Sequence, residues 1–268
     1  MPTLDVPLKA LESPPQRGFG QTERKDLWWL TPLLVFLGLG TFLVYSSWAA
    51  FQGNYYSFGP YLSPMYSPLL FTSRPGWWPA FIPFSAALLI LWAPGGFRIT
   101  CYYYRGAYYK AFWADPPSCA VGEPRKTYWG ERKFPLLLQN IHRYFLYLAL
   151  LFLVLLAHDA WHALWWTHAM DASVPVGARL FELRLGTLVM IINPILLGCY
   201  TLGCHSLRHL TGGRKDVMGN GRRKAYECVS CLNRAHMRWA WFSLFWVMFT
   251  DVYVRMCAMG VWHDWRIH

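Results

Sequence analysis

The chain has 268 residues, of which 55% are hydrophobic and only 15% charged, with 25 Lys and Arg against 14 Asp and Glu. A soluble domain carries nearer a quarter charged residues, so this composition excludes an ordinary soluble protein. No recognised nucleic-acid motif accompanies the net charge of +11, so we expect no nucleic-acid partner.

The first 26 residues are polar and include the pair Pro14–Pro15. This composition predicts a tail without regular structure. We expect no cleavable signal peptide in it. Residues 27–265 are then expected to form one membrane domain.

Five apolar blocks follow the tail, and each can contribute to a helix of the roughly 20 residues that a bilayer requires. They are Leu27–Phe51, Trp77–Phe97, Phe145–Ala157, Leu185–Gly203 and Trp239–Thr250, the last continuing to Trp262. The second contains Pro79, Pro83 and Pro94, so its limits are the least defined. The predicted fold is an all-α, polytopic membrane protein with five transmembrane helices.

The distribution of positive charge predicts the orientation. Most of the 25 Lys and Arg residues fall in the tail and in the loops 98–134 and 207–238. Because cytoplasmic loops are enriched in Lys and Arg, we place these segments and the N-terminus in the cytoplasm and the C-terminus outside. The basic face suits membrane lipids or an acidic soluble partner.

The loop after the second block begins with an unusual run of tyrosines. Tyr102–Trp113 is too polar and aromatic for lipid, yet too apolar for a free loop. We expect an interfacial helix that offers a docking surface for a soluble protein.

A candidate quinone site lies where the third block enters the membrane. His142 can donate to a quinone carbonyl and Arg143 can stabilise developing negative charge; Tyr103 and Tyr104 are further candidates. The alternative is that Arg143 reaches lipid phosphate while His142 packs against a neighbouring helix.

Two H-x-x-x-H pairs occur, and residues four apart share one face of a helix. His158 and His162 lie at the outer end of the third block, while His205 and His209 lie at the inner end of the fourth. A bilayer separates the pairs, which argues against a shared di-iron site. Interfacial polar residues are the simpler interpretation of His158 and His162.

Six possible metal ligands gather on the predicted cytoplasmic side: Cys204, His205, His209, Cys228, Cys231 and His236. Two Cys and two His from this set could hold a Rieske-type [2Fe–2S] cluster, or a structural zinc ion. The first candidate set is His205, His209, Cys228 and Cys231, and the second is Cys204, His209, Cys231 and His236. The absence of any metal is a further alternative.

The fifth block carries Asp251 and Arg255, four residues apart. An intrahelical ion pair is the simplest explanation of two charges at this depth. A role in proton transfer is the alternative.

Several of these motifs together resemble the single-subunit, five-span membrane anchor of one class of succinate dehydrogenase, complex II. They are Cys101–Tyr109, Phe134–Phe145, Tyr200–His209, Leu232–Leu244 and Thr250–Val254. Leu207 departs from the resemblance, because the family often has cysteine there. Cys228 or Cys231 are then candidates for the missing thiolate.

The resemblance implies a bacterial inner-membrane subunit that works with a flavoprotein and an iron–sulfur subunit. It also implies a Rieske-type [2Fe–2S] cluster and electron transfer to menaquinone or ubiquinone. The chain has no flavin fingerprint, so we expect no catalytic residues for succinate oxidation. One rival is haem b held by His142 with His205 or His236, and another is a non-redox membrane protein with a zinc site.

Overall fold

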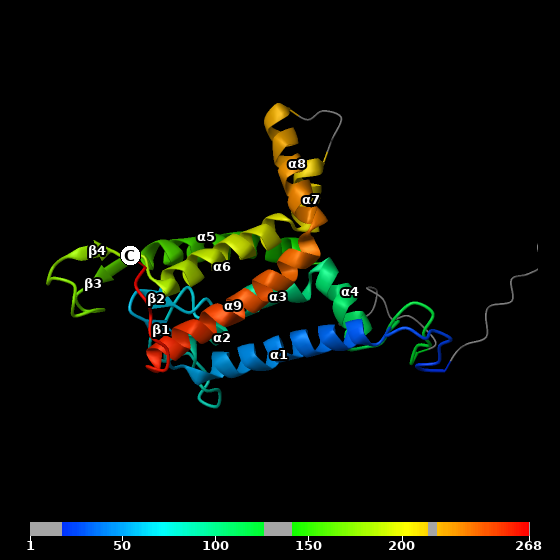
Figure 1. The fold of residues 1–268 in the computed structure, drawn as a ribbon, viewed down its shortest axis with the longest axis horizontal. Helices are drawn as coiled ribbons and strands as arrows, with labels where there is room; N and C mark the ends of the chain where they lie inside the picture. Colours follow the sequence, from blue (N-terminus) through cyan, green and yellow to red (C-terminus); the bar gives the residue numbers. More distant parts are fainter. Residues whose placement is uncertain (1–17, 126–140, 214–218, 268) are drawn as a thin grey trace, which may run out of the picture. The chain divides into compact units, whose positions relative to one another are not determined.

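The computed structural model describes residues 18–125, 141–213 and 219–267, which are mainly helical (Figure 1). Its helices are α1 (Leu30–Gln52), α2 (Ala86–Ile90), α3 (Trp92–Ile99), α4 (Tyr102–Ala111), α5 (His142–His162), α6 (Leu185–Leu202), α7 (His205–Gly212), α8 (Asn220–Arg234) and α9 (His236–Ala258). Two short antiparallel hairpins, β1 (Ser57–Phe58) with β2 (Tyr61–Leu62) and β3 (Trp165–Thr167) with β4 (Arg179–Phe181), were not predicted. The predicted helical class is otherwise confirmed.

The chain divides into two compact units. Residues 1–36 and 106–129 form the first, and residues 37–105 and 130–268 form the second. In the first unit, Gly20 N donates to Gly122 O at 3.0 Å, and Phe36 packs on Phe112. The last part of the predicted tail is therefore attached to a turn of the later loop, while residues 1–17 lie outside the described residues.

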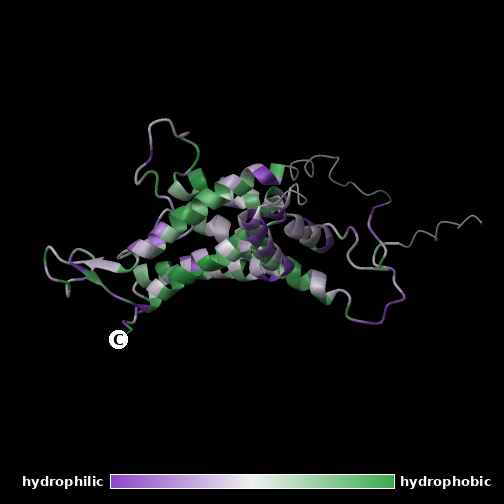
Figure 2. Cartoon of the chain, turned by 90° about the horizontal axis from the view of Figure 1, so that it is seen from above, coloured by the Kyte–Doolittle hydropathy of each residue, from purple (hydrophilic) through white to green (hydrophobic). Residues whose placement is uncertain are grey.

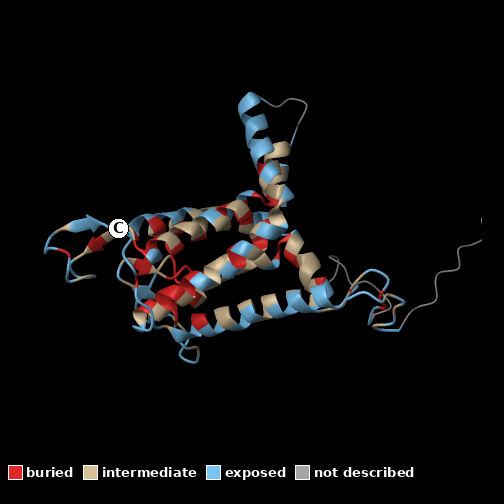
Figure 3. Cartoon of the chain, in the orientation of Figure 1, coloured by how far each residue is buried: buried red, intermediate tan, exposed pale blue. Residues whose placement is uncertain are grey.

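Three of the described helices, α1, α5 and α6, are long and apolar enough to cross a membrane. Apolar side chains face outwards on each of them, for example Val44, Val154 and Ile195, which are 71%, 66% and 56% exposed. Figure 2 shows the apolar colour along the long helices, and Figure 3 shows how much of their surface is uncovered. Lipid is the environment that suits such surfaces.

The second and fifth predicted spans differ from the other three. The second is helical only over α2 and α3, because Pro79 and Pro83 lie in the segment that precedes α2. The fifth is α9, a 23-residue helix that carries Arg238, Asp251 and Arg255. The structure thus confirms a polytopic helical protein with apolar helices.

In the second unit, α6 packs between α5 and α9. Helix α6 contacts both α5 and α9, and α3 contacts α5 (Figure 1). Helices α7 and α8 form a hairpin that stands away from these helices, and α8 is exposed along most of its length (Figure 3). The predicted helix within Tyr102–Trp113 is present as α4.

Buried ionic groups hold together the end of the second unit that carries the two β-hairpins. Asp251, fully buried, accepts from Arg255 Nε at 2.7 Å and from Tyr45 OH at 2.6 Å. Arg255 also donates to the carbonyls of Ala49 and Asn54. The predicted intrahelical ion pair is therefore confirmed, and it joins α9 to the end of α1.

A second ionic group fixes the loop between α5 and α6. Asp171 accepts from Arg184 Nη2 at 2.6 Å and from Arg266 Nη2 at 2.8 Å, while the Arg184 guanidinium lies over the Trp166 ring at 3.4 Å. Hydrogen bonding from Arg184 holds the pKa of Asp171 well below its usual value. The loop is thereby tied to the C-terminal segment.

Two adjacent glycines of α3 should respond in opposite ways to alanine. A Cβ on Gly96 would lie 2.2 Å from a ring atom of Phe145 on α5, whereas one on Gly95 meets nothing within 4 Å. We expect Gly96→Ala to destabilise by about 1–3 kcal/mol through overpacking, and Gly95→Ala to stabilise by about 0.5–1 kcal/mol. Thermal unfolding of the detergent-solubilised protein measures both; similar shifts would contradict the close α3–α5 contact.

Two Arg–acid pairs with the same four-residue spacing provide a test of burial. Arg255→Met leaves Asp251 buried without its partner, which should cost about 3–5 kcal/mol. The matched control is Arg223→Met, whose partner Glu227 is on exposed α8; it should change stability by less than about 1 kcal/mol. Equal losses in chemical or thermal unfolding would exclude a special role for the Asp251 pair.

Candidate functional site

Four side chains from separate elements form two cysteine–histidine pairs. His142 Nε2 lies 3.1 Å from Cys204 Sγ, and Cys101 Sγ lies 3.5 Å from His236 Nε2. Cys101 follows α3, His142 begins α5, Cys204 follows α6 and His236 begins α9. We call these four residues the Cys/His cluster; its two cysteines and His142 are at most 2% exposed.

Aromatic rings hold both imidazoles in place. Phe97 stacks on His142 with the ring centroids 4.8 Å apart, and Tyr200 stacks on His236 at 5.0 Å. Phe97 and Tyr200 contact each other edge to face at 5.4 Å. The two cysteine–histidine pairs are therefore linked through one continuous aromatic contact.

Hydrogen bonding distinguishes the nitrogens of each imidazole. Thr100 Oγ1 lies 2.8 Å from His142 Nδ1, which leaves Nε2 to face Cys204. On His236, Nδ1 is buried and has no hydrogen-bond partner in the described part of the chain. A buried polar atom without a partner is costly unless a ligand uses it.

The possible metal donors of the Cys/His cluster lie as two separate cysteine–histidine pairs. Among residues 18–125, 141–213 and 219–267, no three His, Cys, Asp or Glu side chains are grouped so as to hold one metal ion. Two thiols and two imidazoles in adjacent pairs match the number and type of ligands of a [2Fe–2S] centre with mixed ligation. Metal binding to the Cys204 thiol requires displacement of its proton.

The structure separates the six predicted ligands. Cys204 and His236 lie in the Cys/His cluster. On α7, the Nε2 atoms of His205 and His209 are 2.9 Å apart. Cys228 and Cys231 are exposed on α8.

Cys101 was not predicted as a metal ligand, and His142 was predicted only as a possible haem ligand. No local motif connects them with Cys204 and His236, because the pairs are separated by 62 and 135 residues. Only their positions could have indicated a shared site, because all four residues lie at predicted cytoplasmic ends of apolar blocks.

The predicted quinone residues fall into two groups. His142 and Arg143 line a polar cavity of about 230 Å³, together with Tyr102, Tyr144 and Ser206. Tyr103 and Tyr104 instead face α9: Tyr103 OH accepts from Trp241 Nε1 at 2.5 Å, and Tyr104 OH donates to Ala240 O at 2.6 Å. Of the four predicted quinone residues, His142 and Arg143 thus line this cavity, and His142 also belongs to the Cys/His cluster.

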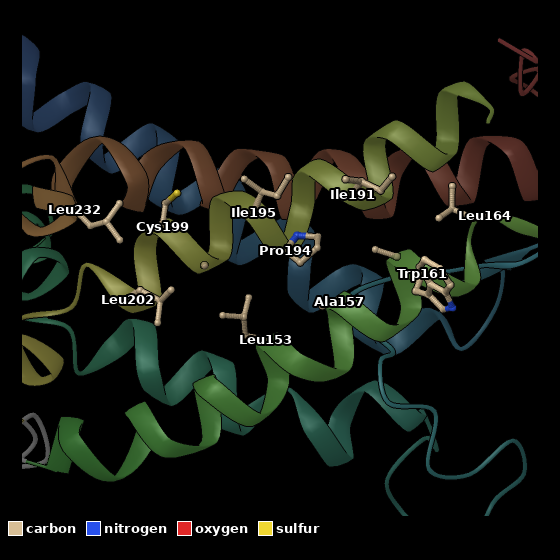
Figure 4. Close-up of a pocket in the computed structure, with 12 residues that line it drawn as sticks. Leu153, Ala157, Trp161, Leu164, Ile191, Pro194, Ile195, Cys199, Leu202 and Leu232 are labelled. Atoms are coloured by element: carbon tan, nitrogen blue, oxygen red, sulfur yellow. The ribbon is translucent and has the colours of Figure 1, made fainter. Parts of the chain in front are cut away.

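A second cavity, of about 580 Å³, lies between α5 and α6 (Figure 4). Its lining is almost entirely apolar, with Leu153 and Ala157 on α5 facing Pro194 and Cys199 on α6. This lining suits a hydrocarbon chain and offers little for polar recognition.

Comparison with known proteins gives two matches. Residues 30–260 match the family described as the actinobacterial succinate dehydrogenase subunit SdhC. The chain is also similar to a chain of the Mycobacterium smegmatis Sdh1 complex in the apo form, with 39% identity, a TM-score of 0.80 and coverage of 96% of this chain and 98% of that chain. No curated protein matches it.

Proposed function

Because the chain belongs to the actinobacterial SdhC family of succinate dehydrogenase membrane subunits, we propose that it conducts electrons from the soluble part of that complex to a membrane quinone. It is a membrane-anchor subunit of complex II in the bacterial inner membrane, and its partners are the flavoprotein and iron–sulfur subunits. Succinate oxidation itself belongs, in this proposal, to the flavoprotein.

The proposed topology has five crossings, by α1, the α2–α3 pair, α5, α6 and α9, with the N-terminus in the cytoplasm. The proximity of the four cluster residues supports this arrangement. Cys101 ends the second crossing, His142 begins the third, Cys204 ends the fourth and His236 begins the fifth. If successive crossings alternate in direction, these four ends lie at the same membrane face, which the basic loops mark as cytoplasmic.

We propose that Cys101, Cys204, His142 and His236 would hold a Rieske-type [2Fe–2S] cluster, whose ligands are two cysteines and two histidines. The two buried, adjacent cysteine–histidine pairs are the observation that carries this assignment. When bound, such a cluster accepts and releases single electrons at a higher potential than an all-cysteine cluster.

The surrounding side chains then have distinct tasks. Thr100 bonds to Nδ1 of His142 and so keeps its Nε2 available. Phe97 and Tyr200 each stack on one face of an imidazole and fix its orientation. In the adjacent polar cavity, Arg143 can bind a quinone carbonyl oxygen, since a fixed cation favours negative charge there.

This assignment changes the role proposed for His142 from quinone donor to metal ligand. Tyr103 and Tyr104 become contacts that hold α4 against α9. The haem alternative is less well supported, because His142 and His236 each face a thiol at close range. The zinc alternative needs donors around one ion, and the described residues form no such group.

Ligand substitution in the whole complex tests the assignment. We expect the dithionite-reduced native complex to give a Rieske-like EPR signal, and Cys101→Ser or His142→Ala to abolish it because each removes an iron ligand. The control is the double variant Cys228→Ser/Cys231→Ser on α8, which should retain the signal.

Iron and zinc content, measured on the same samples, separates the alternatives. A signal lost in the α8 variant but kept in Cys101→Ser would move the ligands to the α7–α8 hairpin. Zinc without a Rieske-like signal in the native complex would overturn the electron-transfer role of this site.

A further inference from the structure

Arg98, in the last turn of α3, is a positive charge placed beside the Cys/His cluster. It is partly buried at the end of a proposed membrane crossing. An ionisable side chain at such a position is costly and marks a functional role. The question is what its charge stabilises.

The partners of Arg98 are all neutral. Its guanidinium donates to Tyr104 OH at 2.9 Å, to Ser243 Oγ at 3.1 Å and to Ala240 O at 3.4 Å. None of the ion pairs found within the described ranges involves Arg98. Three hydrogen bonds to neutral groups therefore fix the guanidinium, while within those ranges its charge has no carboxylate to offset it.

The Tyr200 ring contacts both the Arg98 guanidinium and the His236 imidazole of the cluster. The Arg98 Cζ atom lies 4.8 Å from the centroid of the Tyr200 ring, and Tyr200 stacks on His236. Because Tyr200 is only 1% exposed, little water intervenes to screen the interaction.

We propose that Arg98 is a positioning residue of the redox site, whose fixed positive charge raises the reduction potential of the cofactor that His236 ligates. The inference rests on the proposed function. Reduction adds one negative charge to the cofactor, and a nearby cation stabilises that state more than the oxidised one. Net charge, hydrogen bonding and solvent exposure are the factors that set such potentials.

An EPR-monitored redox titration of the intact complex tests the proposal. Arg98→Gln removes the charge but keeps a hydrogen-bond donor, and we expect its midpoint potential to shift to a lower value. Arg98→Lys keeps the charge, so its midpoint should remain closer to that of the native complex. An unchanged midpoint in Arg98→Gln, with the signal retained, would overturn the proposal.

A matched pair at Ser243 tests the charge without removing Arg98. Ser243→Asp places a carboxylate against the guanidinium and should lower the midpoint, whereas Ser243→Asn adds the same bulk without charge and should lower it less. If the Arg98→Gln complex does not assemble, the midpoint potentials of the two Ser243 variants test the proposal instead. Loss of assembly in both Arg98→Gln and Ser243→Asp, but in neither Arg98→Lys nor Ser243→Asn, would assign the charge to folding and overturn the proposal.

The native complex separates this inference from the function on which it rests. If it gives no Rieske-like signal, the proposed cofactor is wrong, and the inference fails with it. If the signal is present and its midpoint does not respond to these substitutions, only the role of Arg98 is wrong.

Discussion

The meeting of two thiols with two imidazoles is the constraint on which the rest of the structure depends. Cys101, His142, Cys204 and His236 are far apart in the sequence, so the site exists only when α3, α5, α6 and α9 have packed. The absence of a side chain at Gly96 lets α3 approach Phe145 on α5, one helical turn from His142. Packing and function are therefore coupled at this end of the second unit.

The two ends of the second unit use buried polar groups differently. At the end that carries the β-hairpins, Asp251 and Arg255 are bonded to each other and to neighbouring groups. At the other end, the hydroxyl of Tyr200 and Nδ1 of His236 are buried without partners among the described residues. A satisfied network stabilises the fold by itself, whereas unpartnered groups favour the binding of something further.

The sequence predicted the helices better than the site. Apolar blocks located α1, α5, α6 and α9, because long apolar runs identify membrane helices by composition alone. Pro79 and Pro83 shortened the second block to α2 and α3. Spacing motifs drew attention to His205, His209, Cys228 and Cys231, because short motifs report local geometry. The Cys101–His236 contact spans 135 residues and depends on helix packing that no local spacing encodes.

Because the proposed redox site is buried, its own side chains must stabilise the charge that reduction adds. Water would otherwise stabilise the negative charge that reduction adds, but aromatic rings cover His142 and His236. Neutral imidazole ligands add less negative charge than thiolates would, and Arg98 supplies a cation without a carboxylate partner among the described residues. The same cation is unfavourable when nothing negative lies near it. Reduction of the proposed cluster and the burial of Arg98 should therefore stabilise each other.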